Sequence, residues 1–258
     1  MFRFKIPQNK DSILDLHHEE KNQTFDPDHE LGYKEIEILV WNVYKAKRGR
    51  AFLKDFVELT KEKNFLLIQE MITSENMLSL LKNDLNNFFW KMAASFQYRN
   101  KQQTGVMTGA FVPHHESHFV RSQQRELGVL TPKVTLKSEF KISKIDDLNL
   151  MIVNTHAINF TSTSAFVSFI RDAVSLIGEH QGPLIFAGDF NTWNKFRWVE
   201  LVQIFSILGL KEVKFHRDPR KLKLDHIFVR GLTVKDAEIL SDIQSSDHFP
   251  LKIRLSLK

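Results

Sequence analysis

The sequence predicts an α/β domain in which helices cover at least one β-sheet, and three observations support this prediction. Short apolar segments typical of buried strands alternate with segments whose apolar residues recur at helical spacing. No internal repeat, linker or low-complexity tract interrupts this alternation. The chain has 258 residues, 42% of them hydrophobic and 22 of them Phe, which is ample for a buried core. Helices and strands interspersed in this way favour a layered architecture.

The first predicted elements alternate between strand and helix. They are a buried strand over residues 36–41, a helix over 50–63, a short strand over 65–68 and a helix over 74–85. In the first helix Phe52, Phe56 and Leu59 recur at the spacing of one helical face. Residues 1–34 are polar and have no clear period, so we interpret them as an extended or partly ordered N-terminal arm and residues 35–258 as the domain.

The remaining part of the chain is richer in strands. Strands are expected over residues 88–96, 105–113, 117–121, 133–140, 150–154, 184–187, 224–229, 234–240 and 251–255. Helices are expected over residues 162–180, with N-cap candidates at 161–164, and over 193–208. We interpret the cluster of His114, His115 and His118 as a solvated loop between strands, although His118 is within the strand expected over residues 117–121.

Composition narrows the class of protein. The absence of Cys excludes disulfides and thiolate metal sites. The N-terminus has no apolar signal region, and no apolar run approaches the roughly 20 residues of a membrane helix. We therefore expect a cytoplasmic protein without stable membrane insertion, and no protein partner is evident. The net charge of +5 favours polyanionic partners, because a positive field concentrates anions at the surface.

A short acidic motif follows one of the predicted strands. In the string Gly188-Asp189-Phe190-Asn191, a carboxylate and an amide lie close together in the chain, directly after the predicted strand. These two groups can orient a water molecule and hold a phosphate oxygen. Polar residues emerge in the same way within residues 38–42, 66–70, 151–156, 184–191, 222–228 and 246–250.

These polar residues are expected to converge on one pocket, since ligands of open α/β sheets bind beyond the strand ends. The expected set is Asn42, Glu70, His156, Asp189, Asn191, Asp225, Asp247 and His248. It consists of carboxylates, amides and two imidazoles and has no sulfur. Hard oxygen ligands of this kind suit Mg²⁺ or Mn²⁺, which retain waters and accept phosphate oxygens as further ligands.

The order of these motifs resembles the endonuclease/exonuclease/phosphatase superfamily, which includes DNase I. The strings that carry the resemblance are WN at 41–42, QE at 69–70, NTH at 154–156, GDFN at 188–191, LDHIF at 224–228 and SDHFP at 246–250. Residues 41–45, 105–108 and 156–160 are similar to a group of uncharacterised bacterial cytosolic members. The resemblance covers roughly residues 36–256 and implies a four-layer sandwich of two packed mixed β-sheets flanked by helices, with the site at one rim.

The resemblance also implies metal-assisted attack of water on a phosphoester. Glu70 would be the main metal ligand, with Asn42 and Asp247 close to the metal or its waters. Asp189 would orient and deprotonate the attacking water. Each of these residues also has a plain structural interpretation, such as a turn cap for Asn42 or a helix N-cap for Asp189.

The other implied roles concern the phosphate. Asn191 would hold a phosphate oxygen, and His156 would bind another or help the leaving group depart. His248, held by Asp225, would contact the phosphate where charge builds up. A carboxylate beside an imidazole raises the pKa of the imidazole and fixes the orientation of the ring, and both effects suit phosphate binding.

Two basic runs next to these motifs make a nucleic acid the leading expected substrate. The first run contains Lys45, Lys47, Arg48 and Arg50, and the second contains Arg220 and Lys221. Trp193 is a candidate for stacking on a base or sugar, although such residues more often pack under the next helix. A phosphatase or phosphodiesterase for a phosphoinositide, phospholipid headgroup or nucleotide is the alternative. A non-catalytic binding protein on the same fold is the second alternative.

Overall fold

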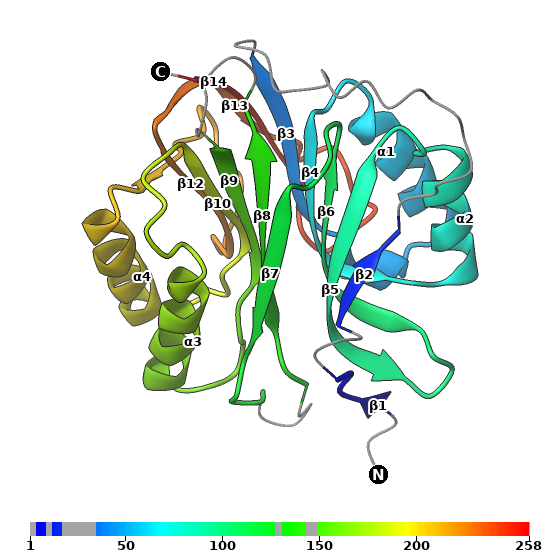
Figure 1. Cartoon of the computed structure of the whole chain (residues 1–258), viewed down its shortest axis with the longest axis horizontal. Coiled ribbons are helices and arrows are strands. Elements are labelled where there is room, and N and C mark those ends of the chain that lie inside the picture. Colours follow the sequence, from blue (N-terminus) through cyan, green and yellow to red (C-terminus); the bar gives the residue numbers. More distant parts are fainter. Residues whose placement is uncertain (1–3, 9–11, 17–34, 127–130, 143–148, 258) are drawn as a thin grey trace.

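In the computed structural model, the described residues form four layers, as Figure 1 shows. Helices α1 (Arg50–Thr60) and α2 (Glu75–Asn83) cover the outer face of one β-sheet, and α3 (Thr163–Ser175) and α4 (Lys195–Ile207) cover the outer face of a second sheet. The structure describes residues 4–8, 12–16, 35–126, 131–142 and 149–257. The predicted sandwich of two packed mixed sheets flanked by helices is confirmed.

The first sheet contains eight strands among the described residues. Its main path runs through β1 (Phe4–Lys5), β5 (Phe89–Tyr98), β6 (Gln103–Ala110), β4 (Phe65–Ile72), β3 (Ile36–Asn42), β14 (Leu251–Leu257) and β13 (Leu232–Ile239), while β2 (Ile13–Asp15) pairs separately with β5. Strands β3 and β4 are parallel, and the other pairs are antiparallel.

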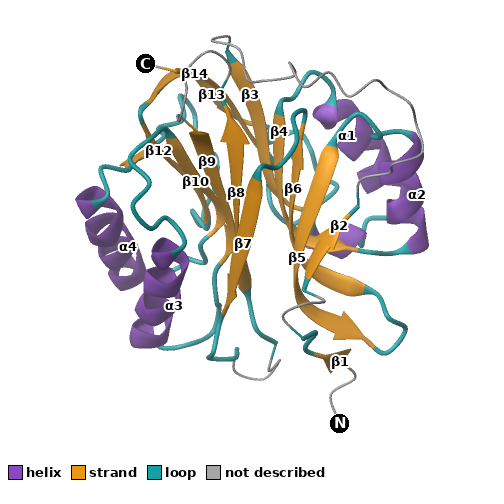
Figure 2. Cartoon of the chain, viewed as in Figure 1, coloured by secondary structure: helices purple, strands orange, loops and turns teal. Residues whose placement is uncertain are grey.

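The second sheet contains six strands among the described residues. Their spatial order is β11 (Lys211–Glu212), β12 (Asp225–Arg230), β10 (Leu184–Asp189), β9 (Asn149–His156), β8 (Val134–Lys141) and β7 (Glu116–Arg121). Strands β9 and β10 are parallel. Figure 2 shows the two sheets packed face to face, with helices only on the outside.

Alternation of side chains along each strand separates the inner core from the two outer ones. In β3, Ile38 and Val40 point into the core between the sheets, whereas Leu39 and Trp41 pack toward the helices of the first sheet. There the Trp41 ring lies 5.3 Å from the ring of Phe52, centroid to centroid. Because both faces of this strand are buried, it appears in the sequence as a continuous apolar run.

A buried polar bridge links the two sheets close to the strand ends. Gln69 Nε2 donates a hydrogen bond of 2.8 Å to Asn154 Oδ1, and Asn154 Nδ2 donates to the Met107 carbonyl at 2.9 Å. Gln69 belongs to the first sheet and Asn154 to the second, and both are fully buried. Because the hydrogen bond between these buried amides joins the two sheets, it helps to fix one sheet relative to the other.

Part of the predicted N-terminal arm adds two strands to the first sheet. Strands β1 and β2 pair with β5, and Ser12 is fully buried. Arg121, on the second sheet, donates hydrogen bonds to Ser12 Oγ at 2.7 Å and to the Ala94 carbonyl at 2.8 Å. Residues 17–34 of the predicted arm lie outside the described residues.

All predicted helices and strands are present, with ends that shift by a few residues. Strands β9 and β10 extend to His156 and Asp189, beyond their predicted ends, because the polar residues at these ends remain paired in the sheet. The sequence analysis missed β1, β2 and β11, which are short and depend on a neighbouring strand for their hydrogen bonds. Among the described residues, no helix is both long and apolar enough to cross a membrane.

His114 is not part of a solvated loop, so that interpretation is wrong for this residue. Its ring lies 4.9 Å from the ring of Phe140, and its Nε2 lies 3.0 Å from the Phe89 carbonyl oxygen. The segment after β6 folds back against the sheet edge, which the sequence pattern did not indicate. His118 does remain at the surface, where it pairs with Glu116 at 2.7 Å.

Acid should destabilise the fold in part through His114. Burial lowers the pKa of His114 to about 4, whereas the ordinary value is 6.5. Between pH 6.5 and about 4 the unfolded chain binds a proton at His114 that the folded chain does not bind. The contribution of His114 to stability is therefore present above pH 6.5 and lost toward pH 4. We expect His114→Gln to reduce the loss of unfolding free energy between pH 7.5 and 4.5 by about 1–3 kcal/mol, measured by urea denaturation. The exposed neighbour variant His115→Gln should show the same loss as the unaltered protein, and an unchanged loss in His114→Gln would contradict the prediction.

Candidate active site

Strand register brings three of the predicted motifs side by side. Strand β10 lies between β9 and β12, and Asp189 at its end is paired with His156 on one side and with Asp225 on the other. The polar side chains within three segments therefore lie together at one edge of the second sheet. These segments are residues 151–156, 184–191 and 222–228.

The facing edge of the first sheet supplies the remaining motifs. Asn42 ends β3, and Glu70 lies in β4 at a β-bulge between Ile68 and Met71, where its φ of 54° breaks the strand geometry. A bulge re-aims a side chain, and here it allows Glu70 to line the cleft. The segment that carries Asp247 and His248 is tied to β3, because Ser246 Oγ donates a hydrogen bond of 2.6 Å to the Asn42 carbonyl.

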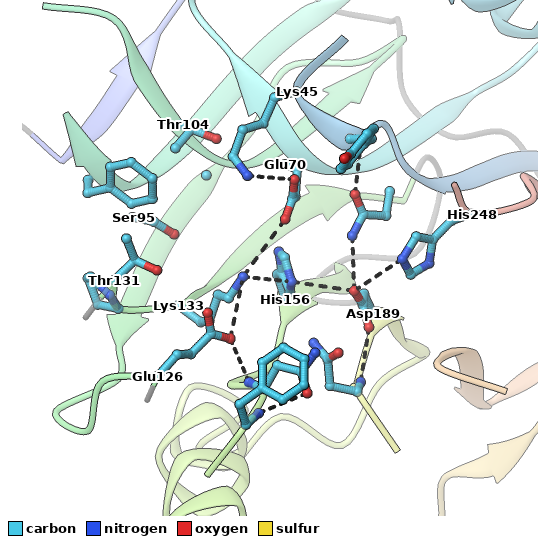
Figure 3. Close-up of a pocket in the computed structure, with 18 of the residues that line it drawn as sticks. Lys45, Glu70, Ser95, Thr104, Glu126, Thr131, Lys133, His156, Asp189 and His248 are labelled. Atoms are coloured by element: carbon cyan, nitrogen blue, oxygen red, sulfur yellow. Dashed lines mark hydrogen bonds and ion pairs between the residues drawn. The ribbon is translucent and has the colours of Figure 1, made fainter. Parts of the chain in front are cut away.

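These residues line one cleft of about 440 Å³ between the ends of the two sheets, shown in Figure 3. The predicted residues that line it are Asn42, Lys45, Glu70, His156, Asp189, Asn191, Asp247 and His248. Asp225 is buried behind His248 and contacts it directly. The structure thus brings together every predicted catalytic and metal-ligating residue.

Asp189 is at the centre of the hydrogen-bond network. Its Oδ2 accepts a hydrogen bond of 2.9 Å from Asn42 Nδ2 and lies 3.4 Å from His156 Nε2 and 3.9 Å from His248 Nε2. Its Oδ1 accepts from the backbone N–H of Asn191 at 3.0 Å. Burial and the nearby Asp225 carboxylate raise the pKa of Asp189 to about 7, which is the range expected of a general base.

The glycine before Asp189 is required by the packing of β10 on β9. Gly188 has a φ of +138°, and a Cβ at this position would lie 2.0 Å from the Thr155 carbonyl oxygen. No side chain fits so close to a neighbouring backbone. Gly188 therefore allows the two strands, and with them His156 and Asp189, to approach each other.

Asp225 and His248 form a partly buried ion pair beside Asp189. Asp225 Oδ2 lies 2.8 Å from His248 Nδ1, which leaves the Nε2 of His248 directed toward Asp189. Burial alone would lower the pKa of His248, but Asp225 and Asp189 outweigh it and raise this pKa to about 10. His248 is accordingly a cation that faces the cleft at neutral pH. The second oxygen of Asp225, Oδ1, is buried and has no hydrogen-bond partner among the described residues.

Glu70 is held by two lysines. Lys45 Nζ donates a hydrogen bond of 2.8 Å to Glu70 Oε2, and Lys133 Nζ lies 3.9 Å from Oε1. Burial would raise the pKa of Glu70, but Lys45 and Lys133 outweigh it and hold this pKa below its ordinary value. Glu70 is therefore an ionised carboxylate with a counter-cation on each side.

The position of Lys45 depends on an unusual backbone turn. The short 3₁₀ segment η2 (Tyr44–Ala46) has three consecutive residues with positive φ, at 49°, 54° and 54°. Non-glycine residues in this region cost roughly 1 kcal/mol or more each, and such strain concentrates at functional sites. The turn directs the Lys45 ammonium toward Glu70 (Figure 3).

Lys133 is the functional candidate that the sequence analysis missed. Its Nζ lies 3.0 Å from His156 Nε2 and 3.6 Å from Glu126 Oε1, so it links Glu70, His156 and Glu126. Burial, with Lys133 and Lys45 nearby, lowers the pKa of His156 well below its ordinary value, so this imidazole is neutral and accepts a hydrogen bond from Lys133. Only the pairing of β8 with β9, which sets Val134 opposite His156, places Lys133 at the cleft.

Most of the predicted substrate-binding residues do not line this cleft. Lys45 does, whereas Lys47, Arg48, Arg50, Trp193, Arg220 and Lys221 are not among its described lining residues. The ammonium of Lys47 lies 3.7 Å above the ring of Tyr44, which lines the cleft, so Lys47 is at its margin. Trp193 and Lys221 are exposed on neighbouring loops.

Arg220 has an internal role that its place in a basic run did not indicate. Its Nε donates to Asp218 Oδ1 at 2.9 Å, and its Nη1 donates to the Asp225 carbonyl at 2.6 Å. Since two of its donors are taken up in this way, Arg220 stabilises the loop before β12 and is poorly placed to bind a substrate phosphate.

The end of the cleft away from His248 has an aromatic wall. Phe4, Phe96 and Tyr98 line it, and the Phe96 ring lies 5.0 Å from Phe4 and 5.1 Å from Tyr98. Ser95 and Thr104 add hydroxyl groups. Because Phe4 belongs to β1, part of the predicted N-terminal arm forms this wall.

The donor atoms in the cleft fit a hard divalent cation. Asn42, Glu70 and Asp247 offer oxygen ligands, and the ionised Glu70 already has cationic groups around it. Asp189, Asp225 and His248 also place potential ligand atoms within 4.8 Å of one another. In both groups some of these atoms already have partners, since Asp225 Oδ2 is paired with His248 and Glu70 Oε2 with Lys45.

Comparison with known proteins gives consistent matches. The sequence profile described as the Endonuclease/Exonuclease/phosphatase family matches residues 39–248. A UPF0294 protein of Vibrio parahaemolyticus is 31% identical over 229 residues, which is 86% of this chain and 78% of the relative.

Solved structures show the same fold at lower identity. A mannosyl-6-phosphatase of Bacteroides thetaiotaomicron is similar with a TM-score of 0.67 and 15% identity, covering 86% of this chain and all of that one (100%). The human Nocturnin catalytic domain, with a bound sulfate anion, is similar with a TM-score of 0.65 and 18% identity, covering 89% and 96%.

Proposed function

Because the chain belongs to the endonuclease/exonuclease/phosphatase family, we propose that it is a metal-dependent phosphodiesterase that hydrolyses DNA or RNA. The observation that carries this proposal is the convergence of Glu70, Asp189 and the cationic His248 on one cleft. Hydrolysis of phosphoric esters is the general chemistry of the family, which includes nucleases and phosphatases. Carboxylates with a raised pKa in a cleft are concentrated at catalytic sites, so Asp189 favours an enzyme over the binding-protein alternative.

Asn42, Glu70 and Asp247 would hold Mg²⁺ or Mn²⁺ in this proposal. The bound ion would neutralise negative charge on the phosphate and lower the pKa of water. Asp189 accepts the proton of the attacking water as the water oxygen bonds to phosphorus. The bond from phosphorus to the leaving oxygen breaks, and the leaving oxygen keeps the electron pair and takes a proton from solvent. Asn42 and the Asn191 backbone orient the Asp189 carboxylate for this transfer.

The cationic side chains stabilise the charge that develops on the phosphate oxygens. His248 remains protonated at neutral pH because of Asp225, and Lys45 and Lys133 carry ammonium groups into the same cleft. Fixed cations in a site that excludes water are worth several kcal/mol in the transition state. His156, which is neutral, accepts a hydrogen bond from Lys133 and so orients that ammonium group.

The basic charge of the chain and the lysines in the cleft support a nucleic acid as substrate. A smaller ester, such as a sugar phosphate, nucleotide, phosphoinositide or phospholipid headgroup, is the second candidate. It is favoured by the wall of Phe4, Phe96 and Tyr98, which limits the length of the cleft at one end. The similarity to a mannosyl-6-phosphatase fold also suits a small substrate.

A substrate panel tests the proposal. The purified chain is incubated with Mg²⁺ or Mn²⁺ and single-stranded DNA, duplex DNA, RNA, mannose 6-phosphate, phosphoinositide micelles or sphingomyelin vesicles, with EDTA as control. We expect metal-dependent cleavage of a polynucleotide. Turnover of only the small esters would favour the second candidate, and full activity in EDTA would eliminate the metal-assisted mechanism.

Replacing Lys133 should weaken catalysis without unfolding the protein. We expect Lys133→Met to lower kcat/KM about tenfold, because one cation near the developing phosphate charge is lost, and Lys133→Arg to restore part of the rate. Lys141→Met is the matched control, since Lys141 is exposed at the end of β8, whereas Lys133 directly precedes the start of that strand. Equal kcat/KM values for Lys133→Met and Lys141→Met would show that Lys133 does not act on the substrate.

A further inference from the structure

Four large apolar side chains are exposed near the cleft, three of them on loops and one, Phe196, in the first turn of α4. Phe160 is 62% exposed, Trp193 43%, Phe196 76% and Leu222 60%. These four, which we call the apolar rim, are among nine large hydrophobic residues exposed in the described part of the chain. Such a concentration beside a proposed active site indicates a surface that a ligand covers.

Contacts made by Arg197 and Thr192 show that the three loops are neighbours. The buried Arg197 donates hydrogen bonds to the carbonyls of Ile158 at 2.8 Å and Thr161 at 2.9 Å, while its guanidinium lies 5.0 Å from the Trp193 ring. Thr192 Oγ1 donates to the Lys223 carbonyl at 2.7 Å. The segments that carry Phe160, Trp193 and Leu222 are therefore fixed against one another.

The apolar rim is continuous with the cleft. Phe160 lines the cleft together with His156 and Asn191, and it is also exposed at the mouth. A planar group stacked on Phe160 would thus share one cleft with a phosphate held by these residues, as the base and phosphate of a nucleotide can.

Basic residues accompany the apolar rim. Lys195, which is exposed, lies between Trp193 and Phe196 in the chain, and Lys221 precedes Leu222. Residues 217–223 contain four basic residues and one acid, Asp218, which pairs with Arg220 and Lys223. These segments therefore carry a net positive charge, which is complementary to a polyanion.

We propose that the apolar rim, with Lys195 and Lys221, is a binding surface for single-stranded nucleic acid that leads into the cleft. Bases stack on Phe160, Trp193 and Phe196, and the lysines pair with phosphates. Duplex DNA hides its base faces, so the surface selects single strands. The proposal rests on the proposed nuclease function and adds its preferred form of substrate.

The chain between the exposed rings favours a nucleic acid over a lipid surface. Asn159 and Thr161 flank Phe160, and Asn194 and Lys195 separate Trp193 from Phe196. Polar residues between single rings suit bases that stack one at a time, whereas insertion into a bilayer needs a continuous apolar face.

Binding measured in EDTA tests the surface independently of catalysis. Fluorescence anisotropy is recorded with labelled oligomers of about 12 nucleotides, as single-stranded DNA, RNA of the same sequence and duplex DNA. We expect the single strands to bind at least about tenfold more tightly than the duplex. Phe196→Ala and Phe196→Leu should each weaken single-strand binding about tenfold, and Phe196→Tyr should retain it. Ile207→Ala, which changes another exposed apolar residue near the far end of α4, is the matched control and should have no effect.

The salt dependence of binding tests the lysines. Each phosphate contact contributes about 0.7 to the slope of log affinity against log salt for a single strand. The double variant Lys195→Ala, Lys221→Ala should therefore lower the slope by about 1.4. Lys54→Ala, an exposed residue of α1 on the opposite side of the molecule, should leave it unchanged.

Three outcomes would overturn the surface proposal. They are equal affinity for single strands and duplex, an unchanged affinity in Phe196→Ala, and binding to phosphatidylglycerol vesicles that Phe196→Leu retains. The last would identify a lipid-binding surface. Single-strand binding without cleavage in Mg²⁺ or Mn²⁺ would instead contradict the proposed function while supporting this surface, so the two failures are distinguishable.

Discussion

Replacing Asp189 with Asn is expected to lower kcat for metal-dependent phosphodiester hydrolysis by more than about a hundredfold. The amide has the size of the carboxylate, but it cannot accept the proton of the attacking water. The fold should tolerate the loss of charge, because burial and Asp225 already raise the pKa of Asp189 to about 7, although the amide can accept only one of the two hydrogen bonds from Asn42 and Asn191. Initial rates on a polynucleotide in Mg²⁺ or Mn²⁺, with thermal unfolding of the same samples, measure both effects.

Glu70→Gln should cause a loss of similar size for a different reason. The variant removes the charged oxygen that would bind the metal, so Mn²⁺ binding, measured by calorimetry or electron paramagnetic resonance, should weaken together with kcat. Asp189→Asn should weaken Mn²⁺ binding less, because its role in the proposal is to accept a proton.

Matched controls come from acids outside the cleft. Asp84→Asn, at the end of α2, and Glu179→Gln, after α3, alter exposed carboxylates and should leave the rate within about twofold. If Asp189→Asn and Glu70→Gln were as active as these controls, the cleft would not be the site of hydrolysis.

Arg197→Met should produce the largest loss of stability among the substitutions considered. Arg197 is fully buried and donates to the carbonyls of Ile158, Asn191 and Thr161. Met fills a similar volume but leaves these acceptors without donors, and each buried unsatisfied group costs about 1–3 kcal/mol. We expect the unfolding free energy to fall by about 3–5 kcal/mol and Tm by about 10 °C, measured by urea and thermal denaturation.

The control for this variant is Arg171→Met, which changes an exposed arginine on α3. It should alter the unfolding free energy by no more than about 0.5 kcal/mol. Because Arg197 also holds the Asn191 backbone, the variant should lose activity below its Tm as well. A Tm equal to that of Arg171→Met would mean that the loops around Asn191 do not depend on Arg197.

The site residues that could be predicted from the sequence are those that continue an apolar strand. Asp189, His156 and Asn42 each follow residues whose burial is evident from composition, so their place at a strand end could be inferred without coordinates. Lys133 could not be found in this way, because it precedes its strand and reaches the cleft only through the register of β8 with β9. The same holds for Phe4, which enters the cleft wall through pairing of β1 with β5.

Runs of basic residues predicted the substrate-binding residues less well than apolar periodicity predicted the strands. Arg220 lies in a basic run, yet its guanidinium binds Asp218 and the Asp225 carbonyl. Lys45 also lies in a basic run and does reach the cleft, but as the partner of Glu70. A run of cations indicates a positive segment of chain, and the acceptors that each cation meets depend on the fold around it.

The amino-acid order was sufficient to determine the layered α/β class, the succession of strands and helices, and the acids, amides and imidazoles that end the strands, because burial and local periodicity are properties of neighbouring residues. The tertiary structure alone decided which of these groups meet, how the pKa values of Asp189 and His248 are shifted, and which aromatic residues remain exposed beside them. These features depend on distances between atoms that are far apart in the chain, and such distances are set only when strand register and the packing of the two sheets are complete.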